Sequence, residues 1–191
     1  MNIMVNKAPH SFENFWGEIA PCEHLLQIYT GDDIFLDSLE GFVGGGIQKG
    51  DGVIVIATPA HLNALNQKLT ARGFNLQTAR ERDQYIPLDT EECLARFMVK
   101  GWPDDKLFEQ FIGELLARAG KNARRVRAFG EMVAVLWAAG RAGATHRLEE
   151  LWQELCQKEG LSLFCAYPKS GFPQDADTSI REICAAHSKM I

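Results

Sequence analysis

The sequence has no long hydrophobic run, no paired cysteine motif and no excess of positive charge, and each absence argues against a class of protein. No apolar stretch approaches the ~20 residues of a membrane-spanning helix. The five cysteines are odd in number and widely spaced without a C-x-x-C, which disfavours a disulfide framework or a zinc site. The N-terminus lacks the basic-then-apolar pattern of a signal peptide. We therefore expect a cytoplasmic protein with reduced thiols and no membrane contact.

The charge balance argues against direct binding of nucleic acid. The net charge is −5, whereas a nucleic-acid surface needs a basic patch. The nearest approach to such a patch is Arg124, Arg125 and Arg127, and alternation along a strand edge explains these at least as well. With 191 residues, 46% hydrophobic and 24% charged, the chain is long enough for one domain spanning residues 1–191.

Short apolar runs alternate with amphipathic segments along the chain. The runs predict strands over residues 24–30, 52–58, 84–88, 124–129 and 161–168. Helices are predicted between them over 32–50, 58–73, 89–98, 106–120 and 145–160, with a further helical stretch after Met132. This alternation predicts an α/β fold of three layers, with a mostly parallel sheet covered by helices on both faces. Residues 1–21 form an N-terminal docking segment with a short helix, and residues 170–191 form a tail that ends in a short helix.

Ligands of such folds bind beyond the carboxyl ends of the strands. The candidate ligand-binding residues therefore follow the strands: Tyr29, Gly31, Asp32, Thr58, Glu131, Met132 and Tyr167. Met132 and Tyr167, with Trp137 and Cys165 near the same edge, would suit a mostly apolar small molecule with one or two polar handles. The alternative is that they belong to the core, which we favour for Trp137.

The first of these turns is where many α/β proteins hold a phosphate, yet it reads Gly31-Asp32-Asp33. A phosphate loop needs G-x-x-x-x-G-K-[ST], whereas this turn has no lysine and two carboxylates that would repel a triphosphate unless a metal ion intervened. Either aspartate could cap the following helix, which we favour, or hold Mg²⁺ or accept hydrogen bonds from a polar ligand. Glu131 could act as a general base, but it suits a hydrogen-bonding anchor, or a partner of Arg127 or Arg141, equally well.

Two histidines are assigned structural or signalling roles. His24 opens the first strand ~16 Å from Tyr29, which lies at the ligand end, so we expect His24 to make a structural hydrogen bond. His187 and Cys184 share one face of the C-terminal helix. A metal site there would need two further ligands, and no nearby cluster in the sequence offers them. We predict no metal, no cofactor and no catalytic pair.

Five segments, in order, carry a family resemblance: FWGEIAPCEHLLQIY, FGEMVAVLW, LEELWQEL, LFCAYP and EICAAHS. Together they resemble the MEDS domain, the methanogen/methylotroph DcmR sensory domain, over residues 12–188. His24 and Tyr29 keep the family pattern of His, four residues, Tyr. The resemblance implies a core similar to that of RecA and KaiC with an eroded phosphate loop, and a sensory role toward small organic molecules such as hydrocarbon derivatives.

Members of this family occur in transcription regulators and fused to histidine kinases. No helix-turn-helix precedes this domain and no kinase module follows it, so the output would pass through such a partner or through self-association as a homodimer. We interpret the chain as a non-catalytic sensor of a small organic ligand. One alternative is a degenerate ATPase that still binds a nucleotide, and another is an interaction scaffold. Only scattered acidic residues and histidines would support an enzyme.

Overall fold

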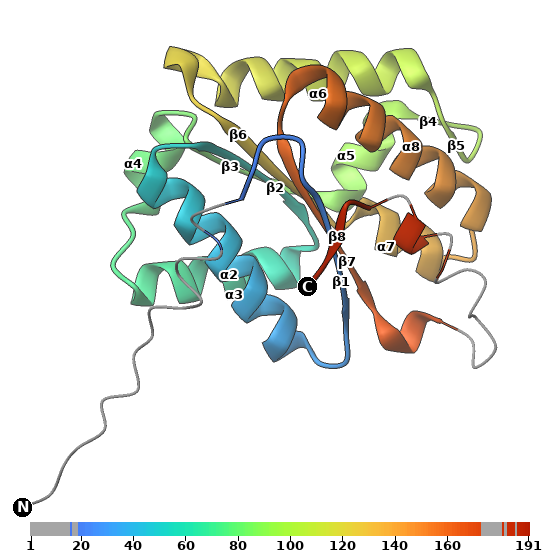
Figure 1. Cartoon of the computed structure of the whole chain (residues 1–191), viewed down its shortest axis with the longest axis horizontal. Helices are drawn as coiled ribbons and strands as arrows, with labels where there is room; N and C mark the ends of the chain where they lie inside the picture. Colours follow the sequence, from blue (N-terminus) through green and yellow to red (C-terminus); the bar gives the residue numbers. More distant parts are fainter. Residues whose placement is uncertain (1–15, 17–18, 173–180, 182, 186) are drawn as a thin grey trace, which may run out of the picture.

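The computed structural model describes residues 16, 19–172, 181, 183–185 and 187–191. Its main sheet has six strands in the order β3-β2-β6-β7-β1-β8, and every pairing in it is parallel. The strands are β1 (His24–Tyr29), β2 (Gly52–Ala57), β3 (Tyr85–Asp89), β6 (Val126–Gly130), β7 (Ser162–Pro168) and β8 (Lys189–Met190). The predicted mostly parallel sheet is confirmed (Figure 1).

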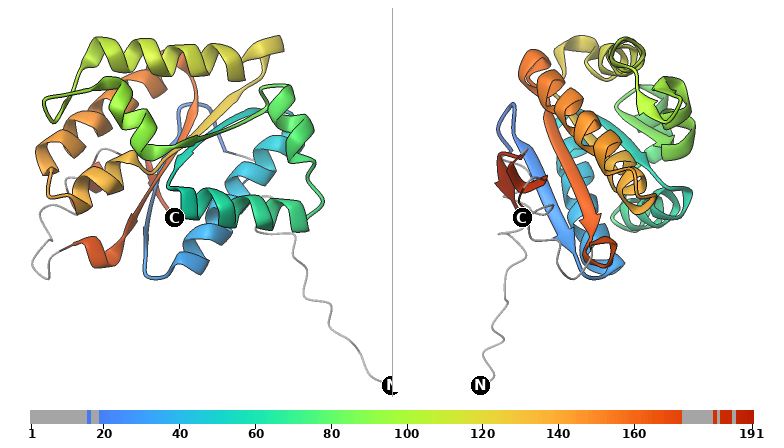
Figure 2. Two further views of the ribbon diagram at one scale, coloured as in Figure 1. Left: turned by 180° about the vertical axis from the view of Figure 1, so that it is seen from behind. Right: turned by 90° about the vertical axis from the view of Figure 1, so that its right-hand side faces the viewer.

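Helices cover both faces of this sheet, as predicted, and Figure 2 gives the same layers from two further sides. One face carries α2 (Asp32–Lys49), α3 (Pro59–Ala71) and α4 (Leu76–Glu81). The other face carries α5 (Thr90–Phe97), α6 (Asp105–Ala119), α7 (Met132–Ala138) and α8 (Ala142–Glu159). No helix of the described residues has the length and hydropathy needed to cross a membrane.

Local sequence signals explain where several helices begin. Asp89 precedes α5, and its Oδ1 accepts hydrogen bonds from the backbone N–H groups of Glu91 and Glu92 at 2.8 and 2.9 Å. Pro59 occupies the first position of α3, where its fixed φ is helical and its missing N–H costs nothing. The β-branched run of β2 is buried along its whole length, as a central parallel strand requires.

The glycines near the end of α2 allow the helix to approach the sheet. A Cβ added at Gly46 would lie 2.8 Å from Val53 Cγ2 on β2 and 3.1 Å from Arg127 Cδ on β6. This separation is too short for carbon atoms, so glycine is needed for the observed packing. Close helix–sheet contact thus accounts for Gly46, whereas Cβ atoms added at Gly44 and Gly45 would meet Phe74 and Trp16 instead.

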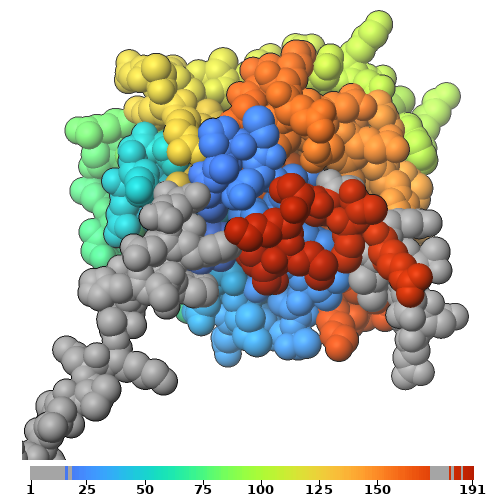
Figure 3. Space-filling model, in the orientation of Figure 1, coloured from blue at the N-terminus to red at the C-terminus, as the bar shows by residue number. Residues whose placement is uncertain are grey.

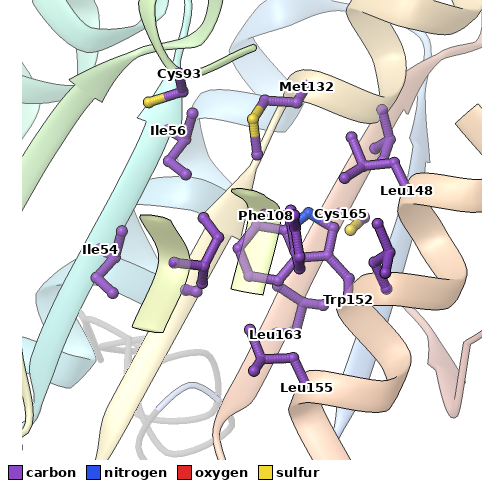
Figure 4. Close-up of a cluster of buried hydrophobic side chains, with 14 of the residues drawn as sticks. Ile54, Ile56, Cys93, Phe108, Met132, Leu148, Trp152, Leu155, Leu163 and Cys165 are labelled. Carbon is purple, nitrogen blue, oxygen red and sulfur yellow. The ribbon is translucent and has the colours of Figure 1, made fainter. Parts of the chain in front are cut away.

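Alternation along the strands divides the core in two. Leu25 and Tyr29 of β1 face α2 and α3, whereas Leu26 faces α7 and α8. On the neighbouring β7, Phe164 faces α2 and Tyr167 faces α7 and α8. Figure 4 shows part of the second core, with Met132 and Cys165 among its side chains. Tyr29 and Tyr167 therefore lie on opposite faces of the sheet.

Several elements were not predicted. They are α4, the antiparallel pair β4 (Met98–Val99) and β5 (Trp102–Pro103), the short 3₁₀ helices at Lys121–Ala123 and Lys169–Gly171, and the terminal strand β8. Most of the N-terminal docking segment, 1–21, lies outside the described residues, although Trp16 and Ile19 are buried against α2. Part of the tail, 170–191, is also outside them; the described residues 181 and 183–185 are helical.

The three arginines considered for nucleic-acid contact all make hydrogen bonds to other residues of the protein. Arg127 is buried, and its Nε donates to Asp51 Oδ2 at 2.7 Å. Arg125 donates to the carbonyl of Ile19 and Arg124 to the carbonyl of Arg82, each at 2.9 Å. Arg127 is thus the partner of Asp51 and not of Glu131, so that part of the sequence interpretation was wrong.

Candidate functional site

The carboxyl ends of β2 and β6 meet around the side chain of Glu131. Its Oε2 accepts a hydrogen bond from the backbone N–H of Thr58 at 2.8 Å, and its Oε1 lies 2.8 Å from Nδ1 of His61. Thr58 and His61 both belong to the start of α3, which follows β2 directly. Glu131 is therefore a hydrogen-bonding anchor for the start of this helix.

An aromatic wall stands beside this anchor. The ring of Tyr29 stacks on Phe35 at 4.8 Å between centroids, and Phe35 meets the edge of His61 at 4.9 Å. We call Tyr29, Phe35, His61 and Glu131 the edge cluster. Its members come from β1, α2, α3 and the turn after β6. They are far apart in the sequence and lie close together because the parallel sheet places the ends of these strands side by side.

The electrostatics of the edge cluster are acidic. Burial, followed by the charges of Glu131 and Asp32, raises the pKa of Tyr29 to about 12. The hydrogen bond that His61 donates to Glu131 raises the pKa of His61, against the opposing effect of burial. Glu131 and Asp32 contribute to both shifts, and their negative charge at this edge attracts a proton and opposes a phosphate group.

The two aspartates of the first turn do not cap α2 with their side chains, contrary to the favoured expectation. Gly31 occupies the cap position in an extended conformation, and Asp32 and Asp33 are the first two helical residues, exposed to solvent. Carboxylates in the first turn of a helix interact favourably with its dipole. Asp32 adds to the negative potential at the edge cluster, as the raised pKa of Tyr29 and His61 records.

Met132 and Tyr167 lie away from the edge cluster. Met132 is fully buried in the core between the sheet and α7, as Figure 4 shows. Tyr167 is also fully buried, and its hydroxyl donates to Glu149 Oε1 of α8 at 2.5 Å. Because Tyr167 and Tyr29 occupy opposite faces of the sheet, the two tyrosines do not line one pocket.

A second group of polar side chains lies inside the protein, at the other end of β1. His24, Glu149, Cys165 and His187 place one ligand atom each within 4.8 Å of one another. We call these four residues the buried polar cluster. The expectation that no further ligands lie near His187 was wrong, because the fold brings three of them from β1, β7 and α8.

Burial dominates the protonation of the buried polar cluster. It raises the pKa of Glu149 to about 7 and that of the Cys165 thiol well above its usual range. Burial, then the neighbouring His24, lowers the pKa of His187 to about 3, so this imidazole is neutral. The expected structural hydrogen bond of His24 exists, since its Nδ1 lies 2.9 Å from Gln153 Oε1.

A hollow of about 640 Å³ opens along the outer edge of β3. Helix α3 forms one side of it, α5 and α6 the other, and β3 the floor. Its apolar lining is Pro59, Leu62, Tyr85, Ile86, Pro87 and Leu88. Its polar lining is Asn63, Asn66, Arg80, Asp89, Glu92 and Arg118. The first two turns of α3 thus touch the edge cluster through His61 and the hollow through Leu62.

The sequence interpretation missed His61 and Glu149. His61 stands three residues after Thr58, a helical spacing that could have placed it over the end of β6, but the sheet order was unknown. Glu149 lies on the apolar face of its helix, between Leu148 and Trp152. This position in the amphipathic pattern could have indicated that its carboxyl group is buried.

One comparison with known proteins gives a match. A family model described as "MEDS: MEthanogen/methylotroph, DcmR Sensory domain" matches residues 23–188. This range includes every strand of the main sheet except the terminal β8, and it includes both the edge cluster and the buried polar cluster. A search of the curated proteins finds no match to the chain.

Proposed function

The chain belongs to the MEDS family of sensory domains, and on this premise we propose that it is a non-catalytic module that binds a small organic molecule. The ligand class is a hydrocarbon derivative, largely apolar with one or two polar groups. The signal passes to a histidine kinase, a transcription regulator or a second copy of the chain. The proposed relation to the RecA/KaiC core stays a prediction, supported by the parallel sheet and the turn after β1.

The observation that carries this proposal is the hollow beside β3. Its volume, about 640 Å³, falls within the ~300–1,000 Å³ of typical small-molecule sites. An apolar floor with a few convergent polar groups suits a ligand of the proposed class. The amides of Asn63 and Asn66 are the polar groups that would orient it, whereas the guanidinium of Arg118 is already bound to Asp83.

The contacts of Glu131 favour binding without catalysis. In an ATPase of related architecture, the acidic residue after this strand must face a metal ion or a water molecule. Here both carboxylate oxygens are engaged by the start of α3, one by Thr58 and one by His61. The turn at Gly31 also offers no lysine to balance phosphate charge. A degenerate ATPase is therefore the weaker alternative.

Helix α3 is the element through which the hollow and the edge cluster would communicate. A ligand that moves Leu62 or Asn63 would also strain the hydrogen bonds of Thr58 and His61 to Glu131. This follows because Thr58, His61, Leu62 and Asn63 all lie at the start of the same helix. In this proposal, the residues beside the start of α3 respond to a movement of the helix. They are Tyr29, Gly31, Asp32, Thr58 and Glu131.

A thermal-unfolding screen tests the proposal. The purified chain is heated with alcohols, aldehydes and organic acids of a few carbon atoms, and separately with Mg-ATP. A ligand at ~100 times its dissociation constant adds ~2.7 kcal/mol, which raises the melting temperature by roughly 5–10 °C. We expect such a shift with an organic compound and none with Mg-ATP. A scaffold would respond to neither.

Two matched variants locate the site. Asn63→Trp fills the hollow, whereas Gln67→Trp adds the same ring to an exposed position one turn along α3, outside the lining. We expect Asn63→Trp to abolish the shift and Gln67→Trp to retain it. A shift that survives Asn63→Trp but is lost in Tyr29→Ala would move the ligand to the edge cluster and overturn the assignment of the hollow.

A further inference from the structure

The buried polar cluster has the composition and the geometry of a metal centre, and we propose that it binds one Zn²⁺ ion. This inference is independent of the ligand proposed for the hollow. The four side chains come from four separate parts of the chain: His24 from β1, Glu149 from α8, Cys165 from β7 and His187 from the segment before β8. Imidazole, thiolate and carboxylate are the ligands that zinc prefers.

Four of the six distances between the ligand atoms are close to the edges of a zinc tetrahedron. His24 Nε2 lies 3.4 Å from Cys165 Sγ and 3.6 Å from Glu149 Oε2. Glu149 Oε2 lies 3.8 Å from Cys165 Sγ and 3.6 Å from His187 Nε2. Tetrahedral coordination with ordinary zinc bond lengths puts such atoms ~3.3–3.6 Å apart. The two remaining distances, from His187 Nε2 to Cys165 Sγ and to His24 Nε2, lie within 4.8 Å, so a closer approach of His187 would complete the shell.

The orientation of the histidines supplies a second, independent observation. Nδ1 of His187 lies 2.7 Å from the backbone carbonyl of Ile183, which only accepts, so this nitrogen carries the proton. The lone pair of His187 Nε2 therefore points into the cluster. This atom is buried, its side chain is 0% exposed, and it has no hydrogen-bond partner within the described part of the chain.

When Glu149 is ionised, the hydrogen bonds of the described residues leave the cluster short of donors. Nδ1 of His24 likewise donates to Gln153 Oε1, which turns the Nε2 lone pair inward, and the hydroxyl of Tyr167 is used by Glu149 Oε1. His187 Nε2 then faces the ionised Glu149 Oε2 at 3.6 Å, and the Cys165 thiol is the nearby donor to this oxygen, at 3.8 Å. A cation at the centre would satisfy all of these acceptors at once.

Charge balance selects a divalent ion. When Zn²⁺ binds, the Cys165 thiol releases its proton to solvent and a Zn–S bond forms. The thiolate and the Glu149 carboxylate together carry two negative charges, and the two imidazoles are neutral. The loaded centre has no net charge, which is the condition for a buried ionic group to be stable.

The surroundings also fit a structural metal. Gln153, Tyr167 and the Ile183 carbonyl hold three of the ligands by their outer atoms, as second partners do in zinc sites. His24 and Cys165 are 0% exposed and Glu149 is 1% exposed, which leaves a substrate no access to the Cys165–His24 pair. A closed centre with four protein ligands is typical of structural rather than catalytic zinc.

The proposed ion would fix the C-terminal residues on the sheet. His187 directly precedes the backbone contacts of β8 with β1, in which Ser188 and Ile191 donate to the carbonyls of His24 and Leu26 at 2.8 and 2.9 Å. Figure 3 shows the C-terminal residues, in red, across the surface between the blue segment that holds β1 and the orange segment that holds α8. Metal binding would therefore control whether β8 stays docked.

Cobalt substitution tests the site on the full purified chain. After metal is removed with a chelator, Co²⁺ is titrated and the absorption spectrum recorded. We expect one equivalent to give the intense visible bands of tetrahedral Co²⁺ and a thiolate charge-transfer band, both of which Zn²⁺ abolishes. Zn²⁺ should also raise the melting temperature and slow amide exchange of residues 188–191.

Matched variants separate this centre from other thiols. Cys165→Ser should lose the charge-transfer band, whereas Cys184→Ser, beside the cluster, should keep it. Gln153→Leu, which removes an outer partner, should keep the band with ~10–100-fold weaker affinity. His187→Gln changes the ligand contributed by the C-terminal residues, outside the helices and central strands, and should lose tight binding and remain folded. The proposal is overturned if the parent chain gives no tetrahedral Co²⁺ spectrum, or if the band follows Cys184 instead of Cys165.

Discussion

His24 and His187 face each other inside the protein, with ring centroids 4.0 Å apart and ring planes at 44°. One residue lies in β1 and the other immediately before β8, which pairs with β1. The contact therefore exists only when the two strands are docked. It links the position of the C-terminal residues to the chemistry of the interior, at the end of the sheet opposite to the edge cluster.

The pH dependence of stability reports the contact between His61 and Glu131. The pKa of His61 is raised in the folded chain, so its stabilising effect is complete below the unfolded pKa of about 6.5. It is lost as the pH rises through the folded pKa. We expect His61→Gln to destabilise most at about pH 6 and progressively less toward alkaline pH, measured by urea unfolding.

A double variant isolates this effect. In the Glu131→Gln background His61 has lost the carboxylate that raises its pKa, so the pH dependence of the His61→Gln difference should disappear. If the loss of stability caused by His61→Gln in the parent chain is the same at every pH, the contact with Glu131 does not raise the pKa of His61.

Removing one partner of the buried ion pair between Arg127 and Asp51 should lower the free energy of unfolding far more than removing one partner of an exposed pair. Their side chains are 2% and 7% exposed and lie 2.7 Å apart. Asp51→Ala leaves the guanidinium buried without its carboxylate, so we expect a loss of ~3–5 kcal/mol in the free energy of unfolding. Lys68 and Asp37 form a pair of the same length at the surface, and Asp37→Ala should cost under ~1 kcal/mol. Equal losses in urea unfolding would contradict the assigned burial.

Two helical glycines should respond in opposite directions to alanine. A Cβ at Gly46 of α2 would lie 2.8 Å from Val53, so Gly46→Ala should destabilise the chain by roughly 1–3 kcal/mol. A Cβ at Gly113 of α6 would meet nothing within 4 Å, so Gly113→Ala should stabilise it by ~0.5–1 kcal/mol. Urea unfolding of both variants checks the pair, and stabilisation by Gly46→Ala would show that α2 does not pack this closely.

Much of the fold follows from local pattern. The alternation of apolar runs and amphipathic segments predicts the layers, and Asp89 and Pro59 mark helix starts through their own chemistry. The missed elements are short: β8 and the hairpin strands have two residues each, too few for a periodic signal. The hairpin strands pair with each other, whereas β8 depends on its contact with the distant strand β1, which local sequence does not encode.

The site was harder to predict because it depends on strand register. Tyr167 pairs with Ile28, not with Tyr29, so the two tyrosines point to opposite faces. The buried polar cluster needs β1, β7, α8 and the C-terminal residues at once. Each member alone resembles an ordinary core or surface residue, and only the assembled sheet brings the four ligand atoms within reach of one another.

The sensor interpretation is tested most directly by following the backbone amides by nuclear magnetic resonance during two titrations. With an organic compound that stabilises the chain, we expect the resonances of Leu62, Asn63 and Leu88 around the hollow to shift. With Mg-ATP, we expect those of Gly31–Asp33 to stay in place. Shifts at Gly31–Asp33 with Mg-ATP, together with no response around the hollow to any organic compound, would contradict the sensor and favour the degenerate ATPase.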